Sequence, residues 1–134
     1  MPMHLKAILL STGLITFGFG LWHVFVPDIW QWYDHIEPRE LVLAVKATNL
    51  FFSISLMWLG GLNMLSVKAM NPFSVVAILS ATTSIWLVRV VFQLVTPQGT
   101  EIPWIQYSML VSFIAVFCLQ AYALLTLVRK PNPN

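Results

Sequence analysis

The chain has 134 residues, of which 58% are hydrophobic and only 9% are charged. Soluble domains carry about 25% charged residues, so this composition excludes an ordinary water-soluble globular protein. The net charge of +2, with no basic cluster, also gives no reason to expect nucleic-acid binding. We therefore expect a single integral membrane domain over residues 1–134, with the lipid bilayer as its first partner.

Four apolar stretches are each long enough to cross a bilayer, which takes about 20 helical residues. They are residues 5–26, 41–66, 72–96 and 103–128. Proline marks their limits: Pro27 is expected to end the first helix, while Asn71 and Pro72 read as an N-cap and a first helical residue. Because the connections are short, neighbouring helices should be antiparallel. The predicted fold class is an all-α four-transmembrane-helix bundle.

The connection after the first span mixes aromatic residues with acids, including Trp30, Trp32 and Tyr33. Such rings favour the headgroup level of a bilayer. We expect a short interfacial helix lying on the outer membrane surface. Anchoring alone would explain it, and a ligand-binding lid is the alternative.

The charged residues predict the orientation of the spans. Cations lie at the N-terminus, in the second connection and at the C-terminus, at Lys6, Lys68, Arg129 and Lys130. The first and third connections are mainly acidic. Lys and Arg accumulate on the cytoplasmic side of inner membranes, so both termini are expected to face the cytoplasm of a bacterial inner membrane.

Arg89 lies inside the third apolar stretch and carries a charge that cannot be lost by deprotonation. An ionisable residue at such depth is a functional-site hypothesis by default. Its partner is expected to be one of the connection carboxylates, Glu37, Glu40 or Glu101, or else a ligand that the chain does not encode.

Helical spacing and depth suggest which residues accompany Arg89. At 1.5 Å per residue, Arg89 lies roughly 10 Å from the outer end of its helix, and several other polar residues lie about 5–12 Å from theirs. With Trp86 as a wall, the predicted ligand-binding residues are Arg89, Lys46, His23, Asn49, Gln93, Gln106 and Trp86. Two alternatives stay open, because Lys46 can snorkel to the surface and His23 can serve as a hydrogen-bonded packing residue. The inner half of the bundle is expected to be plain packing of small and aliphatic residues.

Two cations with a histidine and several amides, and no acid inside the spans, are typical of a pocket for an anionic or carbonyl-bearing group. No catalytic residue and no particular cofactor is predicted. A metal site at the outer surface is a weaker hypothesis, because no tight ligand spacing supports it. Its ligands would be His23, Asp28, Asp34, His35 and Glu37.

Two motifs carry a resemblance to a known group. They are Gly20-Leu-Trp-His23, followed by Pro27, and Trp86-Leu-Val-Arg89-Val-Val-Phe-Gln93. In this the chain resembles a widespread group of small bacterial four-span membrane proteins of unassigned function. The resemblance implies four-helix architecture and groups His23, Arg89 and Gln93 as a set, but it implies no reaction.

The leading functional hypothesis is a non-catalytic inner-membrane protein. It would bind a lipid, a quinone or another small anionic ligand in an outward-facing polar pocket, as an accessory subunit of a larger membrane complex or as a homo-oligomer. The alternatives are an oligomeric anion channel or transporter, and a metal-dependent membrane enzyme.

Overall fold

The computed structural model describes residues 1–29, 39–68, 71–98 and 102–129. These ranges form four helices, which are α1 (Met3–Ile29), α2 (Arg39–Leu65), α3 (Pro72–Val95) and α4 (Pro103–Arg129). Each is long enough and apolar enough to cross a membrane. The predicted all-α four-helix bundle is confirmed, and its spans are those of a multi-pass membrane protein. The predicted interfacial helix lies outside the described residues.

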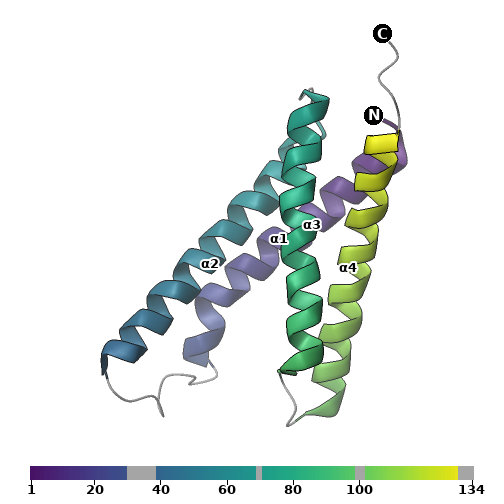
Figure 1. Ribbon diagram of the computed structural model, residues 1–134. Coiled ribbons are helices and arrows are strands. Elements are labelled where there is room, and N and C mark those ends of the chain that lie inside the picture. Colours follow the sequence, from purple (N-terminus) through teal and green to yellow (C-terminus); the bar gives the residue numbers. More distant parts are fainter. Residues whose placement is uncertain (30–38, 69–70, 99–101, 130–134) are drawn as a thin grey trace.

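The helices form two pairs that diverge toward one end of the molecule (Figure 1). We call the end that holds both chain termini the terminal end, and the opposite end, with the α1–α2 and α3–α4 connections, the connection end. α1 runs obliquely behind α3, so it lies near α4 at the terminal end and beside α2 at the connection end. The pair α1–α2 therefore separates from the pair α3–α4 at the connection end.

The pairing of α1 with α2 depends on glycine. A Cβ atom placed on Gly60 would lie 2.5 Å from the backbone N of Phe17 and 2.6 Å from the backbone O of Gly13. A Cβ atom on Gly20 would lie 2.7 Å from the backbone O of Ser53. Small residues of this kind let helix backbones touch in a membrane. Close approach at these glycines therefore holds α1 against α2.

Pro27 lies inside α1, which continues to Ile29, so the prediction that Pro27 ends the helix was wrong by two residues. A proline in a helix leaves the carbonyl four residues earlier without its usual N–H donor, and here that carbonyl belongs to His23. The Asn49 side chain of α2 supplies the missing donor, with Nδ2 2.6 Å from the His23 backbone oxygen. Such replacement donors from neighbouring helices are what make proline tolerable in membrane helices.

The start of α3 follows the predicted capping pattern. The Asn71 side chain accepts a hydrogen bond from the Phe73 backbone N–H at 2.9 Å, and Pro72 occupies the first helical position. At the other end, the Thr96 N–H donates to the Phe92 carbonyl at 2.8 Å. Both limits of α3 are therefore set by local chemistry.

The buried apolar side chains form two clusters along α1, α3 and α4. One, toward the terminal end, contains Leu5, Leu9, Val75, Leu79 and Ala123. The second contains Trp86, Phe113 and Val116, with Phe19 of α1 packed against it. The buried residues of α2 all lie in its second half, so its first half is less covered by the other described helices.

Candidate functional site

A cavity of about 340 Å³ lies among α1, α3, α4 and the segment just after α3. Its described lining residues combine a few polar side chains with aromatic and aliphatic ones: Phe19, Trp22, His23, Val26, Arg89, Gln98, Ile105, Ser108, Met109, Ser112 and Phe113. Its lining residues come from the second half of α1 and the first half of α4, so the cavity lies toward the connection end.

Arg89 is half-buried on the cavity wall among aromatic rings. Its guanidinium carbon lies 4.8 Å from the ring centre of Phe113, 5.6 Å from that of Phe19 and 5.9 Å from that of Phe92. The faces of aromatic rings are partly negative and attract a cation at such distances. The rings therefore stabilise the charge without neutralising it.

The polar partner of Arg89 in the described part of the chain is Gln98, which accepts a hydrogen bond from Nη2 at its Oε1, 2.6 Å away. Nε of Arg89 is buried and has no partner among the described residues. Of the three carboxylates that the sequence offers, only Glu40 is described, and it is not paired with Arg89. Glu37 and Glu101 lie outside the described residues.

Gln98 is held in place by Gln93, one of the predicted site residues. The buried Gln93 side chain donates from Nε2 to the Gln98 backbone oxygen at 3.0 Å. Gln93 therefore acts on the site by positioning Gln98. Gln98 was not among the predicted site residues. The available signal was an amide side chain directly after Pro97, at the end of a helix that carries an arginine.

His23 lines the cavity from α1 and is buried. Its Nδ1 lies 3.0 Å from the backbone oxygen of Phe19, and a carbonyl can only accept, so Nδ1 carries the proton. Nε2 of the neutral ring is then an acceptor. The ring also packs edge-on against Phe19 and Phe52, with centroids 4.2 Å and 5.6 Å away.

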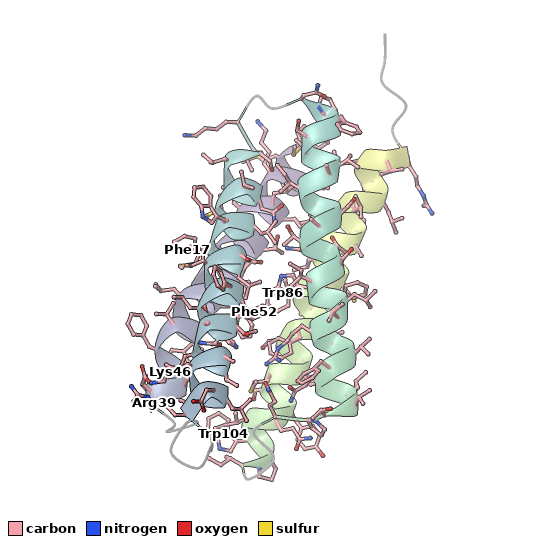
Figure 2. All side chains as sticks on the ribbon, turned by 60° about the vertical axis from the view of Figure 1, so that its left-hand side comes forward. Phe17, Arg39, Lys46, Phe52, Trp86 and Trp104 are labelled. Atoms are coloured by element: carbon pink, nitrogen blue, oxygen red, sulfur yellow. The ribbon has the colours of Figure 1, made fainter. Side chains whose placement is uncertain are left out.

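Trp86 packs against two of the aromatic side chains that line the cavity. Its indole ring lies 5.5 Å from Phe19 and 5.7 Å from Phe113, both of which line the cavity. Its Nε1 donates to Thr16 Oγ1 of α1 at 2.9 Å, which ties α3 to α1. Figure 2 shows Trp86 in the interior of the bundle.

The other predicted site residues do not meet at the cavity. Asn49 binds the His23 backbone, while Lys46 and Gln106 are not among the described residues that line the cavity. Lys46 is exposed and lies in the first half of α2 (Figure 2). The prediction compared the depth of each residue below the outer end of its helix, which assumes parallel helices. Because α1 and α2 diverge from α3 and α4, residues at equal depth need not be close together.

The metal hypothesis receives no support from the described residues, among which no group of three metal-ligating side chains comes together. Of the five candidate ligands, His23 and Asp28 are described. Asp34, His35 and Glu37 lie outside the described part of the chain.

A buried polar layer occupies the half of the bundle nearer the terminal end. Asn63 of α2 donates from Nδ2 to Thr82 Oγ1 of α3 at 2.8 Å, and Gln120 of α4 has 0% exposure. The prediction that this half is plain packing was therefore wrong. Amide side chains inside apolar stretches were the available signal, since polar residues in membrane helices commonly join neighbouring helices.

Gln120 offers a test of this layer, because neither atom of its amide has a partner among the described residues. Replacing Gln120 with methionine removes an unpaired buried dipole at similar volume. We expect the free energy of unfolding to stay unchanged or to rise by about 1–2 kcal/mol. The matched change Asn63→Leu breaks the bond to Thr82 and should lower it by about 1 kcal/mol.

Equilibrium unfolding in mixed micelles measures both variants. A loss of more than about 1 kcal/mol in Gln120→Met would mean that the amide is paired in the folded protein.

Comparison of the chain with protein-family models, with curated proteins and with solved structures gave no match. The functional argument therefore rests on the cavity and on the charge of Arg89.

Proposed function

We propose that this protein is a non-catalytic membrane protein that binds an amphiphile with an anionic or carbonyl-bearing head group in the cavity beside Arg89. One observation carries the proposal. Arg89 is a permanent cation within a membrane-spanning helix, it lines a cavity of about 340 Å³, and the partner that the described residues give it is the neutral oxygen of Gln98. An intramembrane charge of this kind marks a functional site by default.

The lining of the cavity supports a ligand with two unlike parts. Ligand pockets are commonly about 300–1,000 Å³ and mostly apolar, with a few polar groups that fix orientation. Here Arg89 supplies the hydrogen-bond donor for a head-group oxygen, and Phe19, Ile105 and Met109 supply apolar surface. A head group would bind at the former and a hydrocarbon chain along the latter.

The rim of the cavity supports entry from the bilayer. Trp22 of α1 and Ser108 and Ser112 of α4 are exposed lining residues. Both helices have the length and hydropathy of membrane spans, so these exposed faces would meet lipid. This favours a membrane-resident amphiphile over a water-soluble anion.

The charge distribution supports a proposal for the location. Lys6, Lys68 and Arg129 lie at the terminal end of the bundle, which favours assigning that end to the cytoplasm of a bacterial inner membrane. The cavity then faces the outer half of the bilayer. The resemblance to small bacterial four-span proteins supports the same assignment through His23 and Arg89.

Native mass spectrometry of the detergent-purified protein tests the binding. We expect a bound amphiphile on the wild-type protein and at least a tenfold lower occupancy in Arg89→Gln, because a hydrogen bond to a charged group is worth about 1.5–3 kcal/mol. The control is Arg39→Gln, which removes an exposed charge at the start of α2 and should leave occupancy unchanged. Equal occupancy in Arg89→Gln and wild type contradicts the proposal.

A further inference from the structure

We infer that the head group is an anion, and that one of its oxygens takes the position on Arg89 that the Gln98 side-chain oxygen holds in the structure. The inference rests on the proposed function and names the class of ligand. Anionic oxygens at the end of an acyl chain, as in a fatty-acid carboxylate or a phosphodiester lipid, have this chemistry.

The contact between Arg89 and Gln98 marks where an oxygen binds. Gln98 Oε1 lies 2.6 Å from Nη2, and both side chains line the cavity, so the contact is at the cavity surface. An oxygen arriving through the cavity reaches the same nitrogen. Gln98 therefore competes with a ligand for this donor.

The charge balance of the site favours an anion over a neutral carbonyl. The described lining residues include the Arg89 cation and no carboxylate, and the surrounding rings of Phe19, Phe92 and Phe113 contribute no net charge. With an anion, Coulomb attraction between opposite charges adds to the hydrogen bond, and this attraction is stronger in a low-dielectric surrounding than in water. A neutral ligand carbonyl would only replace one uncharged oxygen with another, whereas an anion also compensates the guanidinium.

Only the side chain of Gln98 has to move for this exchange. Its backbone oxygen is bound by Gln93 Nε2 at 3.0 Å, and that bond does not involve the side-chain amide. Rotation of the Gln98 side chain therefore frees Arg89 Nη2 without disturbing the backbone. Gln93 thus holds the Gln98 backbone in place while a ligand oxygen replaces Gln98 Oε1 as the acceptor of the Arg89 hydrogen bond.

Two probes with the same hydrocarbon chain separate the effect of head-group charge from the effect of ligand shape. Oleate and oleamide differ in the head group, a carboxylate against a neutral amide. We expect the wild-type protein to bind oleate about tenfold or more tightly than oleamide, measured by native mass spectrometry titration. Arg89→Gln should abolish this preference. Phosphatidylglycerol against diacylglycerol, which lacks the phosphate, gives the same comparison for a phosphodiester lipid. Comparing phosphatidylglycerol with oleate shows which source of anion binds better.

Gln98 variants test the exchange itself. Gln98→Ala removes the competing oxygen and should tighten oleate binding about threefold or more, whereas Gln98→Glu places a competing carboxylate on Arg89 and should weaken it about tenfold or more. The control Thr126→Ala changes a partly exposed side chain near the far end of α4 that bonds within its own helix, and should have no effect.

The outcomes separate this inference from the proposed function. If oleamide binds as well as oleate and both need Arg89, the proposed function holds and the anionic head group is wrong. If the preference for oleate survives in Arg89→Gln, or if Gln98→Ala binds oleate no more tightly than wild type, the exchange at Arg89 is wrong. If neither the oleyl probes nor the phospholipids bind, the proposed function fails and this inference fails with it.

Discussion

Replacing Gly60 with alanine is expected to cost about 2–3 kcal/mol of unfolding free energy or more, whereas the same change at Gly61 should cost nothing. The new methyl group at Gly60 would lie 2.5 Å from the Phe17 backbone nitrogen and 2.6 Å from the Gly13 backbone oxygen. Backbone atoms cannot rotate away as a side chain can, so α1 and α2 would have to move apart. That movement would also disturb the Asn49 bond that replaces the donor lost at Pro27.

Gly61 is the matched control, being the next residue of the same helix with no atom within 4 Å of an added Cβ. Alanine favours helix over glycine by up to about 1 kcal/mol, so Gly61→Ala should be as stable as the wild type or slightly more stable. Unfolding in mixed micelles gives both values. Equal stability of the two variants would mean that α1 and α2 do not touch at Gly60.

Truncating Trp86 to alanine is expected to have the second large effect. Trp86 is only 2% exposed, so its loss leaves a large cavity, and such changes commonly cost about 3–5 kcal/mol. The rings of Phe19 and Phe113 would lose their support and, with them, the surroundings of the Arg89 guanidinium. We therefore expect both a lower unfolding free energy and weaker amphiphile binding.

Two further tryptophan variants separate the causes. Trp86→Phe keeps most of the ring volume but loses the bond to Thr16, and should cost about 0.6–1.5 kcal/mol plus a smaller packing loss. Trp58→Ala removes a tryptophan that is 68% exposed on α2 and should have little effect on stability. If Trp58→Ala and Trp86→Ala lose the same stability, the buried cluster around Trp86 is not a core of the fold.

The sequence predicted the fold well because the relevant signals are local. The length of each apolar stretch sets the number of spans, and the Asn71-Pro72 pair sets the start of α3 through one side-chain bond and one absent donor. Pro27 shows where local reasoning fails. Whether a proline ends a helix depends on a donor for the freed carbonyl, and that donor, Asn49, is on another helix.

The candidate site was predicted only in part, for the same reason. His23 and Arg89 line one cavity, and Gln93 acts on it through Gln98. Lys46 was placed beside them by depth alone, and the structure puts it on the exposed surface of a diverging helix. Depth along a helix is a property of the sequence, but the neighbours at that depth depend on how the helices cross.

The sequence by itself determined that this protein has four membrane-length helices and that one of them carries a charge that cannot be removed, because hydropathy, span length and the chemistry of arginine are properties of short stretches of chain. Only the tertiary structure decided what surrounds that charge. Backbone contact at Gly13, Gly20 and Gly60 holds α1 against α2. Arg89 faces a cavity lined by residues of α1, α3 and α4, and its hydrogen-bond partner is the side-chain oxygen of Gln98.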